Sequence, residues 1–320
     1  MKVYACYNND LGTRLASSSG GVFTPLAEEV LKNNGAVYGV AMTDDCYAAQ
    51  YIRITDVKDL ALLRGSKYMQ AQIGKILKNV KDDLLIGKKV LFSGTACQIS
   101  GLKKYLWRDY DNLITVDVIC HGVPSQKLWR RYVEHQEYKF GSKLKHVNFR
   151  CKDDSWEDFG MKENELYSSK DTDPFMQMFL LDYCLRPSCY NCLSKKEKVS
   201  DITIADFWGI DRCAPFMNDG NGTSLVIIRT MKGEQLFNDV KTYFKIKEVS
   251  YKDGIRKNPA EHKSPMKPKE RESFYLDMES MDFDSLARKY VYPKHVSIKA
   301  KIIKKIKRIV QSVIRGGKKR

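Results

Sequence analysis

Short apolar strands and amphipathic helices alternate along the first 140 residues, and this repetition is the strongest constraint on the fold. The predicted strands are residues 2–7, 36–42, 89–92 and 113–119, and the predicted helices are residues 22–33, 71–80, 94–106 and 125–139. The strand at 36–42 is expected to pair with residues 47–54. We therefore predict an α/β (mixed α+β) fold, a sheet with flanking helices.

The second half of the chain is less regular and contains a cysteine-rich loop. Its predicted strands are residues 145–150, 201–206 and 224–230, and its predicted helices are residues 173–182 and 233–241. Residues 257–271 are polar with three prolines and are interpreted as a linker. The expected organisation is a domain over 1–256 (an α/β half, 1–140, and a cysteine-loop half, 141–256), a linker with a short helix (257–293) and a basic tail (294–320).

The net charge of +16 is unevenly distributed. Residues 294–320 contain eleven Lys or Arg and no Asp or Glu, which leaves +5 for the first 293 residues. A body so mildly basic does not favour nucleic-acid binding, and no nucleic-acid partner is expected.

The basic tail has the pattern of an amphipathic helix. Isoleucines and valines recur at helical spacing from Ile298 to Ile314, and lysines and arginines fill most other places. This combination fits an anionic membrane surface. The alternatives are an apolar stripe that docks on the protein's own domain and a tail that binds nucleic acid.

The cellular compartment is indicated by the N-terminus and by the cysteines. Asn8, Asn9 and Asp10 leave no room for the apolar core of a signal peptide, and no run of about 18 apolar residues appears. Nine cysteines is an odd number, so reduced thiols or metal ligands are favoured over disulfides. We expect a cytoplasmic protein, peripheral at the inner face of the membrane through its tail.

The cysteines are the most specific chemical feature. Cys184, Cys189 and Cys192 lie within nine residues, while Cys97 and Cys120 each follow a predicted strand. Strand ends gather at one edge of a parallel sheet, so Cys97 and Cys120 are expected to converge beneath the Cys189 loop.

Thiolates in this number suit either a structural zinc or an iron–sulfur cluster, and unligated thiols are a third alternative. The four other cysteines stand apart from any partner and are interpreted as small buried or surface residues. They are Cys6, Cys46, Cys151 and Cys213.

Two further segments and one histidine are candidates for ligand chemistry. Residues 17–21 (SSSGG) precede a predicted helix, where amides and hydroxyls favour a phosphate; an ordinary capped turn is the alternative. Residues 64–68 (RGSKY) offer cations and an aromatic ring for a diphosphate or flavin, or form a charged surface loop. His121, beside Cys120, is a candidate proton donor or a hydrogen-bonded turn residue. The catalytic residue is otherwise unknown.

Taken in this order, the motifs resemble the beta subunit family of coenzyme F420 hydrogenases and dehydrogenases. The resemblance runs from about residue 2 to residue 230. The segments that carry it are residues 17–23, 63–70, 90–102, 117–125, 185–192 and 200–210.

The resemblance implies an oxidoreductase with a flavin, FAD or else FMN, and a [4Fe-4S] cluster. Carried over by motif, the cluster ligands are Cys97, Cys120, Cys189 and Cys192, with Cys184 as the spare. The matching flavin-loop residues are Ser18, Ser19, Gly20, Gly21 and Lys67.

The chain departs from the family pattern in two ways. Fuller members carry an N-terminal ferredoxin-like segment, and this chain is expected to be a form without it. It would then take electrons from a separate protein such as a ferredoxin, or accept them directly on the flavin. Ala96 stands where proline is commoner. The resemblance also implies a link to surface-polysaccharide synthesis, whereas a zinc-stabilised scaffold or binding protein at the membrane is the alternative function.

Overall fold

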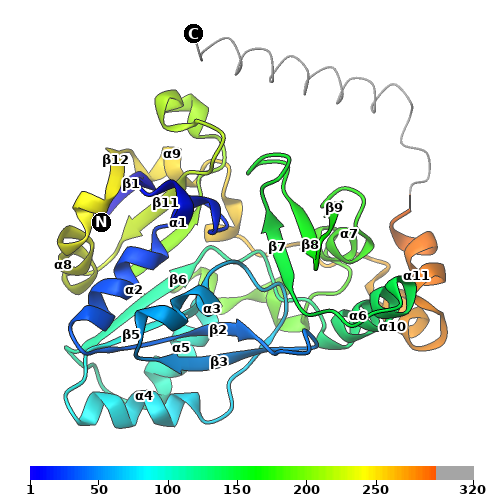
Figure 1. Ribbon diagram of the computed structural model, residues 1–320, viewed down its shortest axis with the longest axis horizontal. Helices are drawn as coiled ribbons and strands as arrows, with labels where there is room; N and C mark the ends of the chain where they lie inside the picture. Colours follow the sequence, from blue (N-terminus) through cyan, green and yellow to red (C-terminus); the bar gives the residue numbers. More distant parts are fainter. Residues whose placement is uncertain (293–320) are drawn as a thin grey trace.

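A computed structural model describes residues 1–292, and the predicted tail helix lies outside this range. The centre of the molecule is a nine-stranded mixed sheet with the strand order β12-β1-β11-β10-β6-β5-β2-β3-β4 (Figure 1). Its strands are β1 (Lys2–Asn8), β2 (Ala36–Met42), β3 (Ala49–Ile54), β4 (Ala71–Gln72), β5 (Val90–Thr95), β6 (Leu113–Val118), β10 (Ile202–Asp206), β11 (Ser224–Ile228) and β12 (Phe244–Glu248). The predicted fold class is confirmed.

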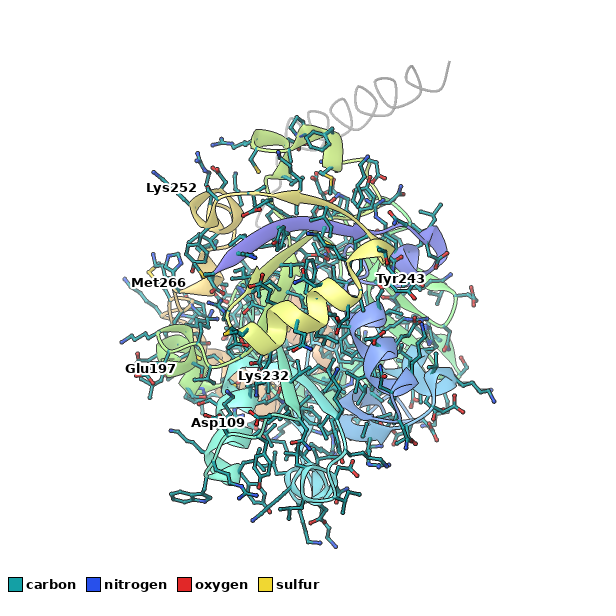
Figure 2. All side chains as sticks on the ribbon, turned by 90° about the vertical axis from the view of Figure 1, so that its left-hand side faces the viewer. Asp109, Glu197, Lys232, Tyr243, Lys252 and Met266 are labelled. Carbon is teal, nitrogen blue, oxygen red and sulfur yellow. The ribbon has the colours of Figure 1, made fainter. Side chains whose placement is uncertain are left out.

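Helices cover both faces of this sheet because its strands alternate between two apolar cores. On β5, Leu91 packs with the helices of one face, whereas Val90 and Phe92 pack with those of the other. The first face is covered by α2 (Phe23–Lys32), α3 (Leu60–Leu63) and α8 (Met231–Asp239), of which α2 and α8 are seen side by side in Figure 2. The second face is covered by α4 (Ile76–Leu85) and α5 (Ala96–Leu106).

A further, strongly aromatic core lies beside the sheet, and the elements that enclose it are at the right of Figure 1. Trp129, Tyr132 and Phe175 are fully buried in it and contact one another through their rings. The elements around it are α6 (Gln126–Phe140), β7 (Val147–Cys151), β8 (Gly160–Glu163), β9 (Leu166–Ser169), α7 (Pro174–Leu180), α10 (Arg271–Ser280) and α11 (Phe283–Tyr290).

Two predictions of local structure need correction. Residues 71–80 are not one helix: β4 comes first, and α4 begins only at Ile76, because Gly74 adopts a φ of +52° that a right-handed helix cannot contain. Residues 257–271 are packed against the body instead of forming a free linker. Asn258 and Glu261 are buried there, and Asn258 donates a hydrogen bond to the carbonyl oxygen of Asp206 at 3.0 Å.

The register of the central strands decides where functional side chains meet. β2, β5, β6 and β10 are parallel neighbours, and Thr95 at the end of β5 pairs with Val118 at the end of β6. Their carboxyl ends therefore share one edge of the sheet. Among residues 1–292, no helix combines the length and apolarity needed to cross a bilayer.

Candidate functional site

Cys97 and Cys120 lie at the shared carboxyl edge of β5 and β6. The chain passes directly from β5 into α5, and Cys97 occupies the first turn of that helix. The side chain of Gln98 accepts a hydrogen bond from the backbone N–H of Thr95 at 2.8 Å, which fixes the helix start. Cys120 follows the end of β6 by two residues, and both cysteines line one pocket.

The second pair of cysteines is brought to this pocket by backbone pairing between two distant turns. The turn after β6 and the cysteine loop form a short antiparallel contact, in which Pro124 is bridged to Leu185. The N–H of Arg186 donates to the carbonyl of Val123 at 2.9 Å. Cys189 and Cys192 follow directly and line the pocket together with Cys97 and Cys120. The structure thus brings together the four cysteines implied by the resemblance.

The environment opposes the thiolate form at two of these cysteines, Cys120 and Cys189. Burial raises the pKa of Cys120 to about 12; nearby Lys195 opposes this rise, and the charges of Cys97, Cys189 and Cys192 add to it. Burial also raises the pKa of Cys189, against a hydrogen bond from the N–H of Val123 at 3.4 Å. A bound cation or cationic cluster would relieve this repulsion, since metal ligation deprotonates thiols.

The donor set fits a metal group by its chemistry, with four sulfur ligands around one pocket. Within residues 1–292, no three His, Cys, Asp or Glu side chains lie close enough as they stand to hold a single ion. The thiols therefore surround the pocket without meeting at one point. Cys97 is the most exposed of the four, and its Sγ lies 3.1 Å from Thr95 Oγ1.

Lys195 is a site residue that the sequence analysis missed. Its side chain is buried at the pocket and donates from Nζ to the carbonyls of Cys120 at 2.8 Å and Lys263 at 3.1 Å. Burial lowers its pKa, and the thiolates of Cys120 and Cys192 oppose that shift. The only sign of it in the sequence is its position, three residues after Cys192.

The spare cysteine and the candidate histidine occupy different positions. Cys184 is fully buried in the aromatic core and does not line the pocket. Its carbonyl oxygen accepts hydrogen bonds from the Ser125 N–H at 2.8 Å and the Tyr275 hydroxyl at 3.0 Å. His121 does line the pocket, and its Nε2 lies 2.7 Å from Asp182 Oδ1. All nine cysteines are described, and all are free thiols.

The serine–glycine loop is held by bonds within the chain. Ser18 Oγ lies 3.0 Å from Ser66 Oγ, so the two candidate flavin segments are in contact. Ser19 Oγ donates to the carbonyl of Thr223 at 2.9 Å, and the N–H of Gly20 donates to Ser224 Oγ at 2.9 Å. Gly20 and Gly21 are both buried rather than facing an open cleft.

Lys67 likewise has its ammonium group turned to the backbone. Its Nζ donates to the carbonyls of Leu62 and Arg64 at 3.0 and 2.7 Å, at the C-terminal end of α3. Burial lowers its pKa to about 7. The loop hydroxyls, the Gly20 amide and Lys67 are therefore occupied as they stand. These residues therefore do not form a ready phosphate site.

A buried ion pair lies beside this loop, at the end of β10. Arg150 donates to both carboxylate oxygens of Asp206, at 2.8 and 3.1 Å, and to the Tyr68 hydroxyl at 3.2 Å. Its guanidinium carbon is 3.9 Å from the centroid of the Phe159 ring. Trp208 is half-buried and stacks on Trp156 with a centroid distance of 4.9 Å.

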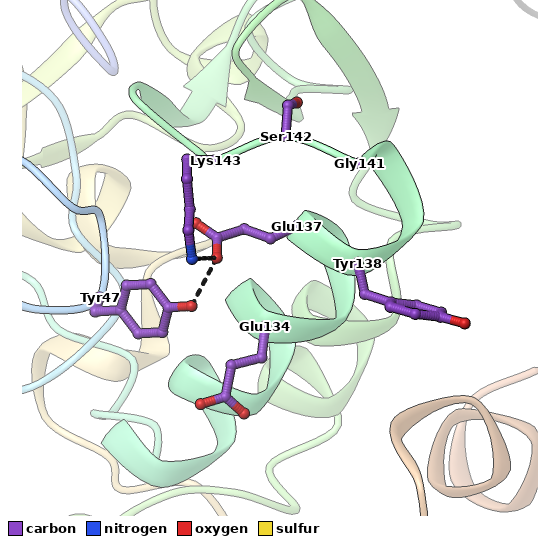
Figure 3. A pocket seen from close by; sticks show the side chains of 7 residues that line it. All are labelled: Tyr47, Glu134, Glu137, Tyr138, Gly141, Ser142 and Lys143. Atoms are coloured by element: carbon purple, nitrogen blue, oxygen red, sulfur yellow. Dashed lines mark hydrogen bonds and ion pairs between the residues drawn. The ribbon is translucent and has the colours of Figure 1, made fainter.

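Another hollow, of about 430 Å³, lies elsewhere, at the end of α6 (Figure 3). Figure 3 shows Glu137 at its centre, where the carboxylate accepts hydrogen bonds from the Tyr47 hydroxyl at 2.8 Å and from Lys143 Nζ at 2.7 Å. None of the candidate site residues lines it.

Comparison with family models identifies two adjoining matches. Residues 3–78 match the N-terminal model, "Coenzyme F420 hydrogenase/dehydrogenase, beta subunit N-term". Residues 87–253 match the C-terminal model of the same family. All four pocket cysteines fall within the second match.

Two individual proteins are similar to the chain. The coenzyme F420-dependent sulfite reductase of Methanocaldococcus jannaschii is 22% identical over 240 residues, which cover 71% of this chain and 35% of that protein. The chain thus spans about a third of the length of this curated relative. A chain of the F420-reducing [NiFe] hydrogenase complex from Methanosarcina barkeri superimposes with a TM-score of 0.59 at 18% identity, over 82% of this chain and 87% of that one. The likeness extends to the fold.

Proposed function

The chain belongs to the coenzyme F420 hydrogenase/dehydrogenase beta subunit family, and on that premise we propose that it is an electron-transfer subunit of a redox enzyme. The observation that carries the proposal is the pocket lined by Cys97, Cys120, Cys189 and Cys192. These cysteines would hold a [4Fe-4S] cluster, which supplies one-electron transfer when bound.

The residues around the pocket have separate tasks in this proposal. Lys195 places a buried positive charge beside the thiolates and offsets part of their negative charge. The N–H of Val123 donates to the sulfur of Cys189, a contact of the type that tunes thiolate ligands. The contact between His121 and Asp182 fixes the orientation of the imidazole ring at the pocket wall.

A flavin is the second group that we propose, as FAD, and it rests on the family resemblance alone. The same resemblance supports a protein electron donor such as a ferredoxin, a cytoplasmic location and a substrate linked to surface-polysaccharide synthesis. The tail sequence supports attachment to an anionic membrane surface.

The experiment is anaerobic purification of the full chain and of single alanine variants, followed by iron, sulfide, zinc and flavin analysis. We expect about four irons per chain in the parent. Cys97→Ala, Cys120→Ala, Cys189→Ala and Cys192→Ala should each lose most of the iron. Cys184→Ala is the control and should retain it, because Cys184 lies in the core. Zinc in place of iron would instead support a scaffold protein, and iron loss in the control would refute the ligand assignment.

A further inference from the structure

Two segments that border the cysteine pocket carry a marked excess of positive charge. Residues 186–198 and 256–269 together contain nine Lys or Arg and two Asp or Glu, a net charge of +7. The first 293 residues have a net charge of only +5, so all other residues of this body have a net charge of −2. The positive charge of the body is therefore concentrated around one site.

Both segments are fixed to the pocket by direct contacts. Ala260 lines it, and Ser264 accepts a hydrogen bond from the N–H of Cys192 at 3.0 Å. Lys195 Nζ reaches the carbonyl of Lys263 at 3.1 Å, which joins the two segments. In Figure 2, Glu197 of the first and Met266 of the second lie on the same side of the molecule.

One of the two acids in these segments is neutralised by buried ion pairs. Glu261 is buried and forms ion pairs with Arg229 and with Lys198, the latter at 3.2 Å. Glu197 is the exposed acid among the residues of the two segments. Three of the five exposed lysines in the two segments define what we call the basic face, and they are Lys196, Lys263 and Lys269.

The basic face also includes exposed apolar side chains. Leu193 is 70% exposed and Met266 is 81% exposed, and each lies within three residues of a basic-face lysine. Cys97, at the same pocket, is exposed as well. An apolar centre within a charged rim is the usual anatomy of a protein–protein interface, and redox encounters use small ones.

We propose that the basic face is the docking surface for an acidic electron-carrier protein. This inference rests on the proposed function and specifies where the carrier binds. Complementary charge steers the carrier and orients its redox centre towards the pocket. In the encounter the carrier is oxidised by one electron and the protein's redox centre is reduced by that electron. A transient partner needs only a small contact, which matches the few apolar groups present.

The test is equilibrium binding of an oxidised acidic plant-type ferredoxin to the full chain, by isothermal titration calorimetry. One variant reverses the basic face, Lys196→Glu/Lys263→Glu/Lys269→Glu. The control reverses three exposed lysines of other elements, Lys145→Glu/Lys241→Glu/Lys247→Glu. Both changes alter the net charge equally and both retain the tail. The titrations are run at about 20 mM salt, where the Debye length is about 20 Å. The basic-face variant should raise Kd at least about tenfold, and the control variant should raise it less than about twofold.

The outcomes separate this inference from the proposed function. Equal weakening in both variants would mean that net charge alone attracts the carrier and would overturn the basic face as a dock. If the basic-face variant binds the ferredoxin as the parent does but no longer binds phosphatidylserine vesicles, the basic face is a lipid contact, and the docking proposal is overturned. A parent protein that dithionite reduces but that does not bind the ferredoxin counts against the docking proposal. A parent that dithionite cannot reduce counts against the redox function itself.

Discussion

Lys195 donates a hydrogen bond from its ammonium group to the carbonyl oxygen of Cys120 at 2.8 Å, which places a buried positive charge at the wall of the cysteine pocket. A buried ammonium is costly unless its protons find acceptors, and here the carbonyls of Cys120 and Lys263 accept them. The cation is thus held in place for an electrostatic effect on whatever the cysteines bind.

The first prediction concerns the reduction potential of the cysteine-bound group. Replacing Lys195 by methionine removes a positive charge that favours the more negative, reduced state. The midpoint potential should therefore fall by tens of millivolts, since net charge and hydrogen bonding set such potentials. Lys195→Arg keeps the charge and should stay near the parent. The midpoint potential is measured by potentiometric titration monitored by visible absorption. Equal potentials for Lys195→Met and Lys195→Arg would contradict an electrostatic role of Lys195.

The second prediction concerns Gly20. A Cβ atom at this position would lie 2.5 Å from the carbonyl oxygen of Cys6 and 2.8 Å from the N–H nitrogen of Ser224, both of them backbone atoms. Gly20→Ala should therefore lower the free energy of unfolding by about 1–3 kcal/mol, the usual cost of overpacking. Bound iron and flavin should fall together, because the defect is in folding.

Gly101 provides the control for this substitution. It lies inside α5, and no atom outside its own turn lies within 4 Å of the added Cβ. Gly101→Ala should raise stability by up to about 1 kcal/mol. Urea unfolding of both variants gives the comparison. Selective flavin loss from Gly20→Ala, with stability intact, would instead favour the original interpretation of the loop as a flavin site.

Much of this architecture could be predicted from local patterns. The range of β2 was predicted without error, and the turn positions of Cys97 and Cys120 follow from apolar strands that end before them. The pairing of residues 123–125 with 184–186 is different, because it joins segments about 60 residues apart. No local periodicity encodes such a contact. The strand ends suggested only that the Cys189 loop lies over Cys97 and Cys120, and the family resemblance supported the same grouping.

The remaining misses have a similar cause. The sequence suggested that Gly20 is a flexible glycine of a phosphate loop. In the structure a glycine is needed there because β1 and β11 leave no room for a Cβ atom, and β11 is distant in sequence. The polar, proline-containing residues 257–271 read as a linker, because the partners that bury Glu261 lie on other elements. Cys184 and Cys189 are indistinguishable by spacing, and burial separates them.

The third prediction concerns pH and Glu163. This residue of β8 is 2% exposed, and burial raises its pKa from 4.5 to about 7, with nearby Asp173 adding to the rise. Tyr132, Gln136 and the charge of Lys139 oppose it. Between pH 4.5 and 7 the folded state holds a proton that the unfolded state has lost. The free energy of unfolding should therefore fall by about 3 kcal/mol as pH rises through this window.

The variant Glu163→Gln isolates this contribution. A neutral amide keeps the shape but no longer titrates, so the difference in stability between pH 4.5 and pH 8 should shrink. Glu165, on the same hairpin, has a side chain 92% exposed, and Glu165→Gln should behave as the parent. Urea unfolding at the two pH values measures both. A parent and a Glu163→Gln variant with the same pH dependence would rule out Glu163 as its source.

The last prediction concerns the tail, which lies outside the described residues. Its isoleucines and valines at helical spacing, among eleven Lys or Arg, fit a helix lying at the headgroup boundary of a bilayer. Each nearby Lys or Arg contributes about 1 kcal/mol on an anionic surface, so binding should be strong at low salt and weaken as salt screens it. Co-sedimentation with phosphatidylserine-containing vesicles should capture the full chain, and a chain ending at Pro293 should stay in solution. Equal capture of both chains, or of neither, would show that the tail is not a membrane anchor. If the shorter chain is still captured, the lipid contact lies in the body, where the basic face is the candidate surface.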